Sequence, residues 1–201
     1  PVSLPALSEA MKAIEQQAEA DEIIDSLLGA IQRVLGYVNV LVLMHDNHRG
    51  CLITTGSMGY ERSGLGSEIA GSDGLIGAAA TSGQTIKVSD MSRVRRFGEA
   101  IALESEGAEN ATRTIAFPQL PTAMSQIAVP MTAGGTVLGV LFIESPERLA
   151  FREEDEAALE ILAGQAASAL RASEREAAAA ELRPAARLPE PIAVGRDVRV
   201  V

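Results

Sequence analysis

The chain is poor in cysteine, in aromatic residues and in basic residues, and each shortage excludes a class of function. Cys51 is the single cysteine among 201 residues, so a disulfide framework and a cysteine-based structural zinc site are excluded within one chain. Aromatic residues make up 3% and tryptophan is absent, which argues against aromatic cages and base-stacking platforms. The net charge of −10 disfavours direct contact with nucleic acid or with an anionic membrane surface.

Long apolar runs are also lacking. No run approaches the length of a membrane-spanning helix, and the first residues show no signal-peptide pattern. Hydrophobic residues nevertheless make up 47% of the chain, which is enough for a core of aliphatic side chains. Together with the single cysteine, this composition predicts a folded, cytoplasmic protein.

Hydrophobic periodicity and turn residues predict alternating helices and strands. A first helix is expected over residues 3–19, and a second runs from Asp21, its expected N-terminal cap, to Gly36. A short helix is expected at 73–82 and a long one at 153–182. The predicted strands are 37–45, 51–57, 68–70, 85–89, 125–131 and 137–143, the last two forming a hairpin across Gly134 and Gly135.

These elements divide the chain into three parts. Residues 1–20 form an N-terminal helix, and residues 21–182 form the main domain with a long C-terminal helix. Residues 183–201 contain three prolines and end in AVGRDVRVV, so we expect a linker and the start of a further domain. Segment 91–123 is irregular, and such long irregular segments in compact domains are usually functional or disordered.

Three segments resemble the GAF domain family when they occur in this order. They are GLIGAAATSGQTIKVSD at 74–90, SQIAVPMTAGGTVLGVLFIES at 125–145 and FREEDEAALEILAGQAASAL at 151–170. The resemblance implies an α+β fold, with an antiparallel sheet of about six strands. It also implies terminal helices on one face of the sheet and a small-molecule cavity under the other. Dimerisation through the terminal helices and control of an attached output domain are implied as well.

A cyclic nucleotide is the first ligand to consider, because family members that bind one often carry an Asn-Lys pair followed by a Phe, three residues and Asp-Glu. Phe151, Asp155 and Glu156 match the second half of this pattern, but Glu144 and Ser145 stand where Asn and Lys would be. The salt bridge implied by the family motif cannot form, and an acidic Glu144 would repel a phosphate. We therefore favour a structural interpretation, in which Phe151 docks the helix start and the acidic residues complement its positive end.

The stretch after the fourth predicted strand is the favoured region for ligand contact. Asp90 ends that strand near the expected cavity, and a following arginine could clamp a carboxylate or phosphate. The alternative is that Asp90 caps the next turn and the arginines balance an acidic surface. The expected ligand-binding residues are Asp90, Arg93, Arg95, Arg96, Phe97 and Gln126.

No catalytic or metal site is expected. His45 and His48 flank a predicted turn, where a solvated role is favoured over haem or zinc ligation. Cys51 lies next to a Val- and Leu-rich strand. The free-methionine-sulfoxide reductases of this family work with several cysteines, whereas this chain has no second thiol to complete such a redox cycle. We therefore expect a small hydrophobic role for Cys51.

The sequence thus predicts a dimeric sensory domain without catalysis, which binds an unidentified small molecule. It does not identify a cofactor. One alternative is a purely structural dimerisation module, whose cavity would be filled by Ile101, Leu103, Ile115 and Leu120. A second alternative is an enzyme of the methionine-sulfoxide reductase type, which would depend on Cys51.

Overall fold

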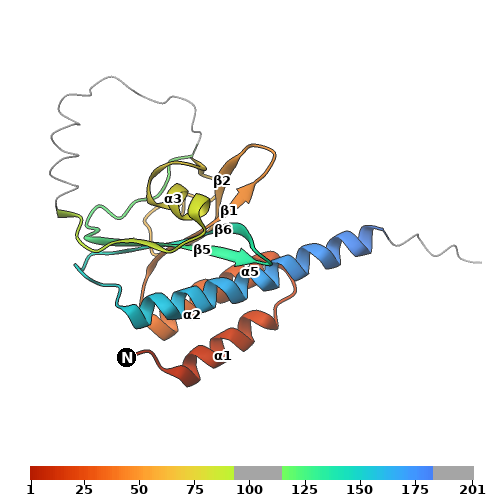
Figure 1. Ribbon diagram of the computed structural model, residues 1–201, viewed down its shortest axis with the longest axis horizontal. Coiled ribbons are helices and arrows are strands. Elements are labelled where there is room, and N and C mark those ends of the chain that lie inside the picture. Colours follow the sequence, from red (N-terminus) through yellow and green to blue (C-terminus); the bar gives the residue numbers. More distant parts are fainter. Residues whose placement is uncertain (93–114, 183–201) are drawn as a thin grey trace, which may run out of the picture.

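The computed structural model describes residues 1–92 and 115–182, which form one sheet between two unequal layers of helix (Figure 1). The helices are α1 (Leu4–Glu15), α2 (Ala20–Leu35), α3 (Gly74–Ser82) and α5 (Glu153–Glu181). The strands are β1 (Asn39–Asp46), β2 (Cys51–Met58), β3 (Glu68–Ala70), β4 (Ile86–Val88), β5 (Ser125–Ala133) and β6 (Thr136–Ser145). Their antiparallel pairing gives the order β3-β2-β1-β6-β5-β4.

The terminal helices α1, α2 and α5 cover one face of the sheet (Figure 1). Their apolar stripes meet alternate residues of β1, β5 and β6, such as Val42, Val129 and Leu141, in the larger hydrophobic core. Helix α3 covers the other face and contributes Ile76 and Ala79 to a smaller core. The α+β class, the six strands and the helical layer are therefore confirmed, while the cavity stays a prediction.

The first two helices differ from the prediction at their ends. Helix α1 stops at Glu15 instead of residue 19, because Ile14 is the last buried residue of its apolar stripe. Helix α2 takes Glu19 as its N-cap, so the predicted cap at Asp21 is wrong. Asp21 lies instead in the first turn, where its carboxylate complements the positive helix end. The predicted end at Gly36 is confirmed, with φ at +79°.

Strand β1 begins two residues later than predicted, because Tyr37 leaves the sheet to pack beside α5. Its ring centroid lies 5.0 Å from that of Phe151, and its hydroxyl donates to the Ala150 carbonyl oxygen at 2.8 Å. Helix α5 then runs past the edge of the sheet, and its residues 174–181 are exposed (Figure 1). None of the helices in the described ranges combines the length and apolarity needed to span a membrane.

Candidate functional site

A polar row crosses three strands on the sheet face that α3 covers. Asn39 of β1 and Gln126 of β5 both lie opposite Glu144 of β6 in the strand register. Residues directly opposite each other in neighbouring strands point to the same face, so the three side chains are adjacent. Leu41 and Phe142 of the smaller core lie two residues away on β1 and β6, which fixes the face as the one toward α3.

An apolar row adjoins the polar one. Phe142 pairs with both Leu41 and Ala128, and Ile86 of β4 pairs with Ala128 in turn. All four belong to, or pack against, the smaller core. This face of the sheet is therefore an apolar floor, buried beneath α3 in the smaller core, that ends in a polar edge.

Glu144 is a buried acid at the centre of the polar row. Its side chain is buried, with the residue 4% exposed. One carboxylate oxygen accepts a hydrogen bond from the Leu120 backbone N–H at 2.9 Å, and the other accepts from Gln126 Nε2 at 2.8 Å. No lysine or arginine within residues 1–92 and 115–182 forms an ion pair with it. A buried acid held only by neutral donors is costly unless something else compensates it.

Tyr60 lies beside this acid with its hydroxyl buried. In the described part of the chain its buried oxygen has no hydrogen-bond partner. Burial, followed by the charge of Glu144 and by the approach of the hydroxyl to its carboxylate, raises the pKa of Tyr60, so the hydroxyl is neutral and able to donate. Gly59 positions it: its φ is +80°, an added Cβ would lie 2.0 Å from the Val38 carbonyl oxygen, and its own carbonyl accepts from Asn39 Nδ2 at 2.7 Å.

The segment after residue 114 covers part of this floor. The Phe117 ring centroid lies 6.5 Å from that of Phe142, and Leu120 is held over Glu144 by its backbone N–H. Of the residues named in the structural-module alternative, Ile115 is 43% exposed and does not fill the space above the floor, whereas Leu120 is half-buried beside Glu144. Ile101 and Leu103, also named in that alternative, lie outside the described residues.

A family model described as a GAF domain matches residues 17–171. The chain belongs to the GAF domain family. Its match with solved structures extends over most of their length but is remote in sequence, so it shows the fold alone. No curated protein sequence matches the chain.

Three solved structures illustrate the range of this fold. The GAF domain of an Acinetobacter phosphoenolpyruvate-protein phosphotransferase has a TM-score of 0.70 and 17% identity, covering 86% of this chain and 94% of that one. A free methionine-R-sulfoxide reductase of Neisseria meningitidis, in complex with its substrate, has a TM-score of 0.63 and 18% identity, covering 88% and 96%. A methyl-accepting chemotaxis protein has a TM-score of 0.60 and 20% identity, covering 85% and 99%.

The residues expected to bind the ligand of this GAF domain are only partly described. Gln126 lies in the polar row. Asp90 accepts hydrogen bonds from the backbone N–H of Ser92 at 2.8 Å and from its hydroxyl, and forms an ion pair of 3.7 Å with Arg148. These contacts agree with the turn-capping interpretation. The other four residues, Arg93, Arg95, Arg96 and Phe97, lie outside the described residues.

Sequence reasoning did not assign Tyr60 or Glu144 to the site. For Glu144 a signal was present: it is an acid within the otherwise apolar strand VLGVLFIES, at a position in phase with Phe142. For Tyr60 no local signal exists, because it lies in a loop and reaches Glu144 only through the fold.

The nucleotide-motif residues have structural roles at the start of α5. Phe151 is 6% exposed and packs against Tyr37. Asp155 accepts a hydrogen bond from the Arg152 backbone N–H at 3.1 Å, which closes the first turn of the helix. Glu156 pairs with Lys87. These contacts support the helix-docking interpretation.

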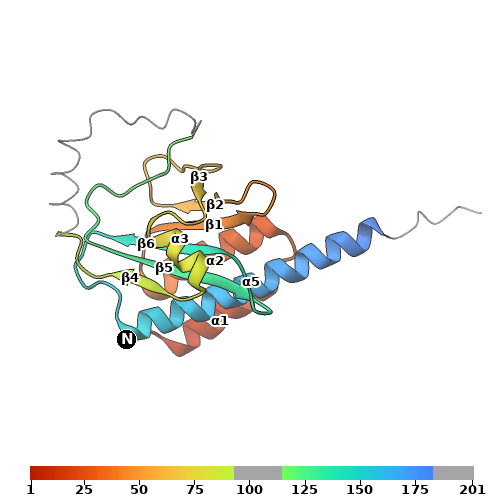
Figure 2. The same ribbon diagram turned by 45° about the horizontal axis from the view of Figure 1, so that its top comes forward.

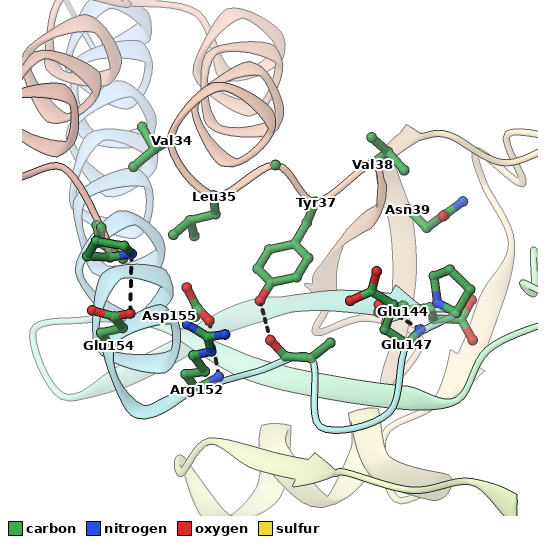
Figure 3. A pocket seen from close by; sticks show the side chains of 16 residues that line it. Val34, Leu35, Tyr37, Val38, Asn39, Glu144, Glu147, Arg152, Glu154 and Asp155 are labelled. Carbon is green, nitrogen blue, oxygen red and sulfur yellow. Dashed lines mark hydrogen bonds and ion pairs between the residues drawn. The ribbon is translucent and has the colours of Figure 1, made fainter.

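A hollow of about 470 Å³ lies at the start of α5, and Asn39 and Glu144 of the polar row are among the residues that line it. Figure 3 shows Tyr37 reaching across it, with Arg152, Asp155 and Glu154 at the helix end. Its polar groups are largely paired with one another: Tyr37 with Ala150, and Arg152 with Asp155 through the backbone. We interpret it as the junction that seats the helix.

Cys51 and the histidines lie away from the polar row. Cys51 pairs with Asp46 at the far end of β1 from Asn39, about 23 Å away at 3.3 Å per residue. The thiol is buried, and burial followed by Glu68 and Asp46 raises its pKa, which disfavours the reactive thiolate. Across the described residues no three His, Cys, Asp or Glu side chains form a group able to hold a metal ion.

Proposed function

We propose that this GAF domain is a sensory domain that binds a small molecule over the sheet face covered by α3 and controls an attached output domain through α5. The observation that carries the proposal is the polar edge of that face. There the buried Glu144 has only neutral donors, and the buried Tyr60 hydroxyl has no partner in the described residues. Polar groups left in this state are costly unless a ligand completes their hydrogen bonds.

The same geometry specifies the chemistry of the ligand. Leu41, Phe142 and Ala128 are buried in the free protein, so a flat or aliphatic body would reach this floor by displacing what covers it, such as Phe117. An amine or another hydrogen-bond donor on the ligand would meet Glu144, and an acceptor beside that donor would meet Tyr60. Such a combination of an apolar floor with a few convergent polar groups is typical of small-molecule sites.

We further propose that the domain has no catalysis of its own, although the reductases share its fold. Cys51 is the only cysteine, is buried, and lies at the opposite end of β1 from the polar row. A redox cycle at the polar row would lack both an attacking and a resolving thiol there. The sensory assignment draws support from the fold shared with residues 122–287 of a methyl-accepting chemotaxis protein.

A thermal-shift screen tests the binding proposal. The panel contains free amino acids, primary amines, nucleobases, cyclic AMP and cyclic GMP. A compound at one hundred times its Kd stabilises the folded state by about 2.7 kcal/mol, which shifts Tm by roughly 5–10 °C for a domain of this size. We expect an amine-bearing compound to do so, and native mass spectrometry to detect it bound to the protein.

Two variants decide whether the compound occupies the proposed site. Tyr60→Phe removes the free hydroxyl and should weaken binding about tenfold, as expected for loss of one buried hydrogen bond. Glu68→Gln, on the far edge strand β3, is the matched control and should leave binding unchanged. A panel without any stabilising compound, or one whose effect is the same in Tyr60→Phe, would contradict the proposal.

A further inference from the structure

Strand β4 presents different chemistry on its two faces. Within residues 1–92 and 115–182, its three residues pair only with β5, at the edge of the sheet. Ile86 packs against the smaller core, and Val88 pairs with Gln126 of the polar row, so both belong to the face of the candidate site. Because side chains alternate along a strand, Lys87 points to the opposite face, toward the terminal helices.

On that opposite face, β4 and the residue before it hold α5 by two side-chain contacts. Lys87 Nζ lies 2.5 Å from Glu156 Oε2, and both side chains are less than one-third exposed. Thr85 donates its hydroxyl to Glu160 Oε1 at 2.6 Å. Glu156 and Glu160 are four residues apart, hence on one side of the helix. Figure 2 shows β4 lying along the first turns of α5.

The end of β4 is also tied to the loop that leads into α5. The Leu149 N–H donates to the Ser89 carbonyl oxygen at 2.8 Å, and Arg148 pairs with Asp90. Leu149 has a φ of +55° although it is not glycine, and its side chain is 72% exposed. Neither its side-chain packing nor its backbone preference accounts for this conformation, so the contact with Ser89 helps to hold it.

We propose that β4 is a coupling strand, which transmits occupancy of the site at Tyr60, Gln126 and Glu144 to the first turns of α5. The proposal rests on the proposed function, because it describes how that site is read out. A ligand lying against Ile86 and Val88 displaces a three-residue edge strand more easily than a central one, since β4 is paired on one side only among the residues that the structure describes. Lys87 and Thr85 then move with the strand, and their contacts with Glu156 and Glu160 of α5 change.

Hydrogen exchange on the ligand-free chain tests the coupling. The readout is the amide exchange of residues 157–161 of α5, relative to residues 166–170 of the same helix, which report global stability. The double variant Thr85→Ala, Lys87→Met should speed exchange at 157–161 about three- to fivefold, the effect of losing two modest polar contacts. Ile86→Ala, on the site face, should speed it about threefold in the wild-type background and add nothing in the double variant.

The matched control is Arg49→Met, which removes an exposed ion pair with Glu68 on the other edge of the sheet. It should leave exchange in α5 unchanged. The coupling is wrong if the double variant has no effect on residues 157–161, or if Ile86→Ala has the same effect in both backgrounds. The exchange experiment contains no ligand, so it is independent of the thermal-shift screen. If Ile86→Ala adds nothing in the double variant but no compound stabilises the domain, only the proposed function is contradicted. If a compound binds but the effect of Ile86→Ala on exchange is the same in both backgrounds, only the coupling role of β4 is contradicted.

Discussion

The two tyrosines show how residues of one type acquire different roles from their partners. Both are partly buried, and burial is the first cause of a raised pKa in each. Tyr37 donates its hydroxyl to the Ala150 carbonyl and so anchors the loop before α5. The Tyr60 hydroxyl has no partner in the described residues and lies at the polar row. One is therefore a structural contact, and the other is available for binding.

Removing each hydroxyl should separate these roles. Tyr37→Phe leaves the Ala150 carbonyl without its donor and should lower the free energy of unfolding by about 1 kcal/mol. Tyr60→Phe removes a buried hydroxyl that approaches Glu144 but forms no hydrogen bond of normal geometry within the described residues, so the free energy of unfolding should stay the same or rise by up to about 1 kcal/mol. Urea denaturation of the two variants beside the wild type measures both. An equal loss in the two variants would show that Tyr60 is already satisfied in the free protein.

At the scale of elements, the sequence was most informative where the signals are local. Gly36 ends α2 and Gly83 ends α3, each with a positive φ that glycine adopts without strain. Gly134 and Gly135 likewise close the hairpin between β5 and β6. Such positions can be found from sequence because the conformational demand is satisfied by the residue itself.

Errors arose where two residues compete or where distant contacts decide. Glu19 and Asp21 are both acids near the start of α2, and the helix begins one residue after Glu19, which sequence alone did not distinguish. Tyr37 continues the apolar pattern of β1, yet its contact with Phe151 removes it from the strand. The site itself depends on such contacts, since Tyr60 and Glu144 meet only after the sheet has formed.

The start of α5 offers a test of the role assigned to Asp155. Its carboxylate accepts from the Arg152 N–H, whereas Glu154 beside it is a partly exposed acid of the same turn. Both Asp155→Ala and Glu154→Ala remove one negative charge near the positive helix end. Glu154→Ala also removes an exposed ion pair of 3.6 Å with the Pro1 amino group, which contributes little to stability, so the difference between the two variants reports chiefly the capping hydrogen bond. Asp155→Ala should lower the free energy of unfolding by about 1 kcal/mol more than Glu154→Ala. Similar losses in chemical denaturation would contradict the cap.

For the whole molecule, α5 is the element through which the proposed control of an output would pass. Its inner side supplies Leu159, Leu162 and Leu170 to the larger core, while its last turns extend beyond the sheet (Figure 1). The outer side carries Ile161, which is 43% exposed, next to the small residues Ala157 and Gly164. Positions 157, 161 and 164 follow the spacing by which two helices interlock.

We therefore expect the domain to dimerise through its terminal helices, with Ile161 in the contact. Light scattering should give twice the mass of one chain for the wild type, and Ile161→Glu should shift it to the monomer, because an unpaired charge would be buried between the helices. Leu65→Glu is the control, since Leu65 is comparably exposed at 49% but lies in the loop before β3, away from the terminal helices. A wild-type monomer at high concentration, or equal effects of the two substitutions, would contradict this interface. A confirmed dimer would place the first turns of α5 beside the subunit contact. A change in the contacts of Lys87 and Thr85 with these turns would then alter the spacing of the two α5 helices in the dimer.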